Sequence, residues 1–110
     1  MRGVFISLAA LGAAAVLAGC DLGQDATLFD GHRFRTKLSK QDARHVFVVT
    51  ASPVSASRVG AAEAARYAAT RYCVSNFGSS EIVWTVGPDQ DLDALPVSDD
   101  RLTLQGACPQ

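Results

Sequence analysis

The sequence predicts an α+β domain with two layers, in which one helix packs on a mostly antiparallel four-stranded sheet. The chain has 110 residues and a formal net charge of −1, values that fit one small domain. Residues 58–77 show the periodicity of an amphipathic helix. Two stretches of strand character precede this helix and two follow it, so the expected order is β-β-α-β-β. We expect the domain to span residues 29–110.

The predicted helix, RVGAAEAARYAATRYCVSNF, runs from Arg58 to Phe77. Ser55 or Ser57 can cap its start, because a hydroxyl accepts hydrogen bonds from the free N–H groups of a first turn. Gly78 can end it, because glycine tolerates the left-handed conformation. Alanine dominates the inward side and allows close approach, so the sheet must supply the bulky core residues. The predicted buried residues are Ala61, Ala62, Ala65, Ala68, Ala69, Tyr72 and Cys73.

Two strands are predicted before the helix. His32–Leu38 alternates with a period of two residues, so one face is basic and the other mostly apolar. Arg44–Ala51 is β-branched and apolar on both faces, which is typical of an inner strand. They should form a hairpin that stops at Pro53, because proline lacks the N–H that a sheet requires. The two faces of the first strand are Arg33, Arg35 and Lys37 on one side and Phe34, Thr36 and Leu38 on the other.

Two further strands are predicted after the helix. Glu81–Val86 and Arg101–Gly106 both alternate in polarity. Between them, residues 89–100 form an acidic stretch that contains Pro96, which we interpret as a loop. The sequence leaves the order of the strands within the sheet open. The residues expected to face inward are Ile82, Trp84 and Val86 in the first strand and Leu102 and Leu104 in the second.

Residues 1–19 are predicted to be a signal peptide. Arg2 precedes an apolar run, Val4–Leu17, that is too short and too rich in alanine for a comfortable membrane span. The run ends in Leu17-Ala18-Gly19-Cys20, which resembles the lipobox of bacterial lipoproteins. The resemblance implies that Cys20 carries diacylglycerol, that cleavage precedes it, and that its new amino group is acylated, with palmitate as the expected acyl group. The alternative is an ordinary secretory signal with a cysteine nearby.

Residues 20–28 are interpreted as the lipidated cysteine and a tether. The polar stretch Asp21–Thr27 can span at most about 25 Å when fully extended, so the domain should stay close to the bilayer on its periplasmic side. Asp21 follows Cys20, which resembles the inner-membrane retention signal of enteric lipoproteins. This favours the inner membrane and leaves the outer membrane open.

The expected charge of the processed chain disfavours a nucleic-acid partner. Removal of residues 1–19 removes Arg2 and no acid, so 10 basic residues become 9 against 11 acidic residues, a net charge of −2. Nucleic-acid-binding domains usually carry a strongly basic surface. The expected partners are therefore the membrane, through the lipid anchor, and another envelope protein.

Once Cys20 is lipidated, Cys73 and Cys108 are the remaining cysteines, and one intramolecular pairing is available. A disulfide can persist in the oxidising envelope compartment. A disulfide between these two positions would reduce the entropy of the unfolded chain, which predicts a stabilisation of about 4 kcal/mol. The rival interpretation is a reactive or metal-binding thiol, but the sequence contains no Cys-x-x-Cys and neither histidine stands at ligand spacing from a cysteine.

The acidic stretch resembles a calcium loop only at its start. Asp89, Asp91 and Asp93 have the expected spacing, and Asp100 occupies the twelfth position. Ala94 stands where the loop needs a glycine, and the twelfth residue is too short for the usual bidentate glutamate. We therefore favour a solvated acidic loop over a calcium site and expect no metal.

Basic side chains form the candidate contact surface: Arg33, Arg35 and Lys37 on the first strand, and Arg66 and Arg71 on the helix. They could meet lipid headgroups or an acidic partner. The alternative is the solvated face of an edge strand and a solvated helix surface. Glu63 precedes Arg66 by three residues, which indicates a surface pair on the helix.

The sequence nominates no catalytic site and no cofactor. His32 and His45 lack an evident catalytic partner, and the common nucleophile, phosphate-binding and zinc motifs are missing. We therefore predict a non-enzymatic accessory or scaffold protein that acts by protein contact. The main alternative is a binding module for a small ligand, lipid or cell-wall fragment, which a deep apolar pocket beside the Trp84 strand would favour. A small hydrolase would require a cluster of acids around one of the histidines.

Overall fold

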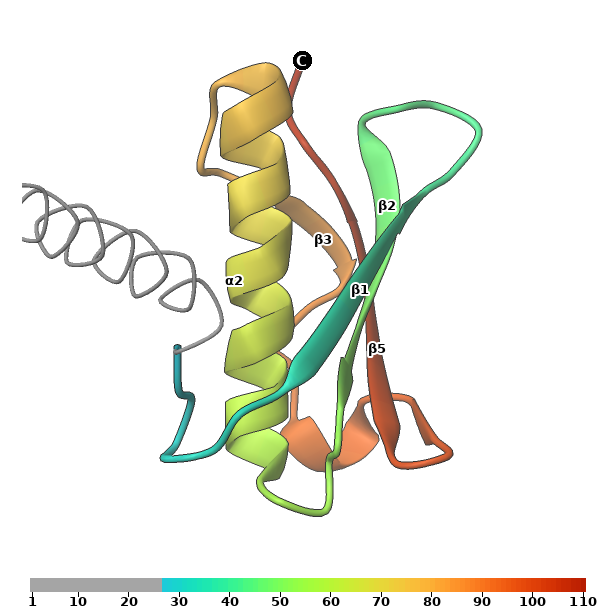
Figure 1. The fold of residues 1–110 in the computed structure, drawn as a ribbon. Helices are drawn as coiled ribbons and strands as arrows, with labels where there is room; N and C mark the ends of the chain where they lie inside the picture. Colours follow the sequence, from blue (N-terminus) through green and yellow to red (C-terminus); the bar gives the residue numbers. More distant parts are fainter. Residues whose placement is uncertain (1–26) are drawn as a thin grey trace, which may run out of the picture.

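The computed structural model describes residues 27–110 and confirms the predicted α+β class, with one α-helix packed on an antiparallel sheet (Figure 1). The sheet has five strands, so the expected number of four is wrong. The predicted signal peptide, Cys20 and most of the predicted tether lie outside the described residues. The elements are β1 (Arg35–Lys40), β2 (Val46–Ser52), α2 (Arg58–Phe77), β3 (Val83–Val86), the 3-10 helix η2 (Leu92–Ala94), β4 (Val97–Ser98) and β5 (Arg101–Ala107).

The strands are ordered β1-β2-β5-β3, and every pairing is antiparallel. One edge of β5 pairs with β2, from Val46 opposite Ala107 to Ala51 opposite Leu102. The other edge pairs with β3 and β4. The prediction that β2 is an inner strand is confirmed. β1 pairs only with β2 among the described strands and therefore forms an edge of the sheet.

The strand that the sequence did not predict is β4, which lies inside the expected acidic loop. Val97 and Ser98 pair with Leu102 and Arg101, so the turn between β4 and β5 consists of two residues. These residues, Asp99 and Asp100, have φ angles of 54° and 61°, both in the left-handed region that the tight turns of hairpins require. An Asp-Asp pair lacks the glycine that usually signals such a turn, which explains why the sequence did not predict this hairpin.

The helix has the predicted bounds and caps. The Oγ of Ser57 accepts a hydrogen bond from the N–H of Gly60 at 2.9 Å and donates one to Oδ2 of Asp30 at 2.6 Å. Gly78 has a φ of 70°, and its N–H donates to the carbonyl oxygen of Val74. No helix of residues 27–110 combines the length and the apolar character that a membrane span requires.

The core lies between α2 and the facing side of β2 and β5. As predicted, the helix contributes mainly alanine and the strands contribute the bulk, above all Phe47, Leu102 and Leu104, all fully buried. The ring of Phe47 meets Trp84 edge-on, with centroids 5.8 Å apart. The opposite side of the sheet is not covered by any other element of residues 27–110 (Figure 1).

The disulfide prediction agrees with the structure. The sulfur atoms of Cys73 and Cys108 lie 2.02 Å apart and the Cα atoms 5.4 Å apart. Both residues are buried in the core cluster. The bond joins the last turns of α2 to the chain just after β5, as the inward position of Cys73 on the helix predicted.

Three strands start later than the sequence predicted: β1 at Arg35, β2 at Val46 and β3 at Val83. Residues 27–34, here called the N-terminal arm, lie before β1 instead of forming its first half. In this arm Phe29 and His32 make an isolated β-bridge. The turn between them has positive φ angles, which bend the chain out of the extended path that a longer β1 would need.

Candidate functional site

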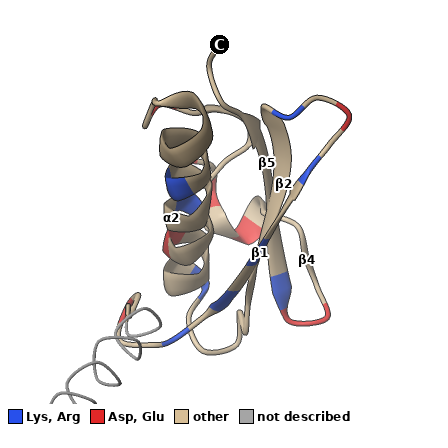
Figure 2. Cartoon of the chain, turned by 45° about the horizontal axis from the view of Figure 1, so that its top comes forward, with Lys and Arg blue, Asp and Glu red and all other residues tan. Residues whose placement is uncertain are grey.

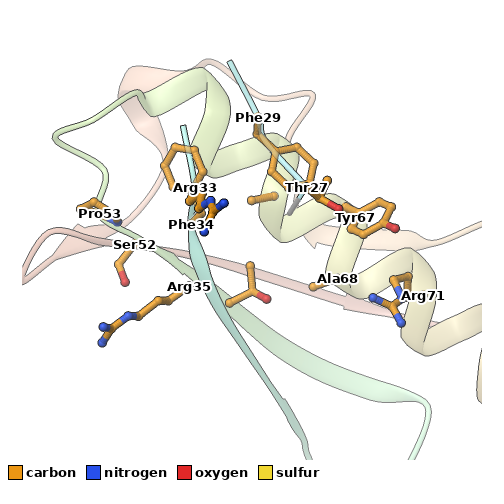
Figure 3. A pocket seen from close by; sticks show the side chains of 12 residues that line it. Thr27, Phe29, Arg33, Phe34, Arg35, Ser52, Pro53, Tyr67, Ala68 and Arg71 are labelled. Carbon is orange, nitrogen blue, oxygen red and sulfur yellow. The ribbon is translucent and has the colours of Figure 1, made fainter. Parts of the chain in front are cut away.

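A hollow of about 1080 Å³ lies between α2, β1 and the N-terminal arm, and is here called the β1 groove (Figure 3). Its lining combines three arginines with three aromatic rings, several hydroxyl groups and small side chains. The lining residues are Thr27, Phe29, Arg33, Phe34, Arg35, Thr36, Ser52, Pro53, Ala64, Tyr67, Ala68 and Arg71.

The helix wall of the groove is a single stripe of side chains. Ala64, Tyr67, Ala68 and Arg71 follow the spacing i, i+3, i+4, i+7, which places them on one flank of α2. The two alanines leave room above the helix backbone. Tyr67 is 45% exposed, and the guanidinium carbon of Arg71 lies 5.8 Å from the centre of its ring. An arginine over an aromatic face provides a cation beside an apolar surface.

The N-terminal arm closes one end of the groove with aromatic rings. Phe29 packs against Tyr67 with ring centroids 5.6 Å apart. Phe34 lies over Gly60, where a side chain would collide with the ring. These contacts hold the arm against the first half of α2, and the groove opens beside the middle of the helix, from Ala64 to Arg71.

β1 runs through the groove and offers a different chemistry on each side. Figure 3 shows Arg35 and Ser52 on one side of the strand and Tyr67, Ala68 and Arg71 on the other. Thr36 has the predicted orientation toward the helix side, but it is exposed rather than buried because the groove opens there. The groove therefore wraps around the free edge of β1.

A second, smaller hollow of about 400 Å³ lies on the uncovered side of the sheet. Here the register aligns Arg35 with Ser52 and Lys37 with Thr50, and β5 adds Arg101. Three cations thus converge on one sheet face with small hydroxyl side chains between them. Local sequence patterns offer no reason to group Arg101 with β1, because the 60 residues between Lys40 and Arg101 include the whole helix.

The structure brings together some of the predicted contact residues and separates others. Arg33, Arg35 and Arg71 line the β1 groove, while Lys37 lines the hollow on the other side of the sheet. Arg66 lies apart from both hollows and forms an ion pair with Asp89, with Nη2 and Oδ1 2.9 Å apart. The expected pairing of Arg66 with a glutamate on the same helix is therefore wrong.

Within the part of the chain that the structure describes, no carboxylate forms an ion pair with a basic side chain of β1. Within residues 27–110 the Arg66–Asp89 pair is the single ion pair with a nitrogen–oxygen distance within 4.0 Å. Among residues 27–110, no aspartate or glutamate lines either hollow. Figure 2 shows basic residues recurring along β1 and acidic residues concentrated at turns and loops. The surface around β1 is consequently suited to an anionic ligand.

The acidic residues of the predicted loop have separate roles. Asp89 pairs with Arg66, and Asp91 accepts a hydrogen bond from the N–H of Asp93 at the start of η2. Asp100 accepts hydrogen bonds from the N–H and the hydroxyl of Ser55, both at 2.7 Å. No cluster of three or more metal-ligating side chains occurs in residues 27–110.

The groove is equipped for binding by cations, hydrogen-bond donors and aromatic surface. Its described lining includes the hydroxyl groups of Thr27, Thr36, Ser52 and Tyr67, and none of residues 27–110 contributes a histidine, cysteine or carboxylate to it that could act as a base. His32 belongs to the arm and His45 to the chain just before β2, so the two histidines lie on separate parts of the fold. This chemistry suits recognition of a partner.

Several groove residues were not identified from the sequence. Phe29 and Thr27 precede every predicted strand. Tyr67 lies on the polar helix face that periodicity assigns to solvent, where a contact surface is one interpretation and a plain solvated surface is the default. The alternative hypothesis placed a pocket beside the Trp84 strand, but the groove lies between α2, β1 and the N-terminal arm. The ring of Trp84 instead covers Gly106, where a Cβ would lie 3.0 Å from its Cε3 atom.

Comparisons of the chain with protein-family models, with curated proteins and with solved structures each find no match.

Proposed function

We propose that this protein is a lipid-anchored envelope lipoprotein that acts as a non-enzymatic accessory or scaffold, and that it contacts another envelope protein through the β1 groove. The observation that carries the proposal is the groove itself, an open hollow with aromatic, cationic and hydroxyl groups at an exposed sheet edge. Interfaces of this kind are enriched in aromatic residues and arginine, which combine contact area with directed hydrogen bonds.

The lipid anchor rests on Leu17-Ala18-Gly19-Cys20 and the apolar run before it. Thr27 both ends the polar stretch Asp21–Thr27 of the predicted tether and lines the groove. With at most about 25 Å of extended chain between Asp21 and Thr27, the groove would be presented close to the bilayer surface. Asp21 favours the inner membrane, and the outer membrane stays open. A partner would then be an integral or peripheral protein of the same membrane.

The alternative function, a binding module for a small ligand, lipid or cell-wall fragment, has one specific observation in its favour. Arg33, Arg35 and Arg71 line the same groove as the aromatic rings of Phe29 and Tyr67, a combination that also fits an anionic amphiphile. The two functions differ in what occupies the groove in the cell, and one crosslinking experiment distinguishes them.

The test is photo-crosslinking in intact cells with a photoreactive amino acid in place of Tyr67. We expect one protein adduct, identified by mass spectrometry, which disappears when Ala68→Trp fills the groove. The matched control places the same photoreactive residue at Gln90, which is exposed and outside the groove. A lipid or glycan adduct at position 67 would support the alternative, and no adduct at this position would overturn both functions.

A further inference from the structure

The backbone edge of β1 is available for pairing. β1 contributes six residues, each opposite one residue of β2, with no break in the register. Its other edge has no partner strand among residues 27–110. In an edge strand, alternate residues direct their N–H and C=O groups outward, where they can pair with another extended chain.

Edge strands are commonly protected from pairing by proline, by a bulge or by charged side chains, and β1 has only the charged side chains. The strand, RTKLSK, contains no proline, and its unbroken register leaves no bulge. The groove keeps the flank of α2 away from part of the edge. Arg35, Lys37 and Lys40 remain, and they would oppose a second copy of β1 or any basic strand. An acidic strand would instead gain from Arg35 and Lys37, which share the uncovered face of the sheet, whereas Lys40, opposite Phe47, lies on the helix face.

The two sides of β1 also define which side chains an added strand can carry. Successive side chains of a strand point to opposite faces. On the helix side they would meet the Ala64 and Ala68 surface and the ring of Tyr67, which favour apolar groups. On the other side they would meet the row of Arg35 and Lys37, which favours carboxylates. The matching segment therefore alternates apolar and acidic residues.

We propose that the partner presents an extended polypeptide segment, alternating in apolar and acidic residues, which pairs with the free edge of β1 and lies in the β1 groove. This inference rests on the proposed function, because it specifies the partner's binding segment at the same site. Backbone hydrogen bonds would hold the segment, and the alternating side chains would select it.

The test uses the full-length protein in detergent and a fluorescein-labelled eight-residue peptide that alternates valine and glutamate. Fluorescence anisotropy should show saturable binding, and Arg35→Glu should raise the Kd by about tenfold or more. The matched control is Arg66→Glu, the same change at an exposed arginine outside both hollows, which should leave the Kd unchanged. Equal weakening by the two variants, or no binding to the wild type, would overturn the inference.

Strand pairing is tested separately from charge with two N-methylated peptides. One carries methyl groups on the odd-numbered amides and the other on the even-numbered amides, so side chains and charge stay the same. Pairing along one edge uses only one of these sets of N–H groups. One peptide should therefore lose binding and the other retain it. Equal loss with both peptides, or retention by both, would overturn strand addition.

The cellular crosslinking experiment separates failure of this inference from failure of the proposed function. If position 67 captures a protein that the valine–glutamate peptide does not displace, the inference is wrong while the proposed function stands. A lipid occupant is tested with vesicles of phosphatidylglycerol and the Cys20→Ser variant. Vesicle binding that depends on Arg35, combined with no peptide binding, would assign the groove to lipid and overturn the inference.

Discussion

Phe34 of the N-terminal arm packs directly on Gly60 of α2, where a Cβ would lie 2.8 Å from both Cε2 and Cζ of the ring. The same Cβ would lie 2.7 Å from the carbonyl oxygen of Phe29. Gly60 thus lets the arm approach the helix closely enough to form one end of the β1 groove. Glycine usually weakens a helix, so its position here has a tertiary reason.

Gly60→Ala should destabilise the protein, although alanine is favoured over glycine by about 1 kcal/mol in a helix interior. The new methyl group must displace the arm, because one of its close neighbours is a backbone oxygen rather than a flexible side chain. Thermal unfolding should show a lower Tm than the wild type, and the valine–glutamate peptide should bind more weakly. A raised Tm would mean that helix propensity outweighs the arm contact.

Cys20→Ser should abolish lipid labelling and leave either an unprocessed precursor or a product released from the membrane. The physical reason is that a thiol is required to carry the diacylglycerol in the lipobox that residues 17–20 resemble. The measurements are incorporation of labelled palmitate and fractionation of the cells. Cys73→Ser is the control, because it should leave labelling intact. Wild-type processing and membrane association of Cys20→Ser would contradict the lipoprotein proposal.

Loss of the Cys73–Cys108 pair should lower stability strongly. The bond reduces the entropy of the unfolded chain, and this effect predicts a stabilisation of about 4 kcal/mol. That value is a large share of the free energy of unfolding expected for so small a domain. The double variant Cys73→Ser, Cys108→Ser should melt well below the wild type, and reductant should lower the Tm of the wild type only. A thiol assay on the unfolded, unreduced protein that finds both cysteines reactive would contradict the bond.

Asp100→Asn should destabilise the protein by about 1 kcal/mol, the usual net worth of an intramolecular hydrogen bond. Asparagine tolerates the left-handed backbone at this position but cannot accept both hydrogen bonds from Ser55. Asp99→Asn is the matched control, since Asp99 shares the left-handed conformation and should change stability by less than about 0.5 kcal/mol. Urea unfolding measures both variants, and equal effects would show that the contact with Ser55 contributes nothing.

Arg66→Ala should change stability by no more than about 0.5 kcal/mol, because solvent screens an ion pair between exposed side chains. The side chains of Arg66 and Asp89 are 51% and 79% exposed. Urea unfolding provides the measurement. A loss well above this value would show that the pair anchors the acidic loop to α2, in addition to satisfying two surface charges.

Local patterns in the sequence determined α2 and most of the core. Its 20 residues carry their own periodicity, a serine cap and a terminal glycine, so its bounds were predicted without knowledge of the fold. The inward positions of Leu102, Leu104 and Cys73 follow from the same kind of local alternation. These features depend on the chain near each residue, which is why the sequence alone is sufficient for them.

Only the tertiary structure decided the strand order, the β4 hairpin and the β1 groove. The groove joins residues 27–36 to a flank of α2 more than 25 residues later, and that flank includes Tyr67, which periodicity alone assigns to solvent. Arg71 shares the helix flank of Tyr67 and lines the groove, whereas Arg66 lies outside it and pairs with Asp89. Contacts between distant segments form when the sheet and helix pack together, so the sequence nominates the basic residues and the packing selects which of them share a site.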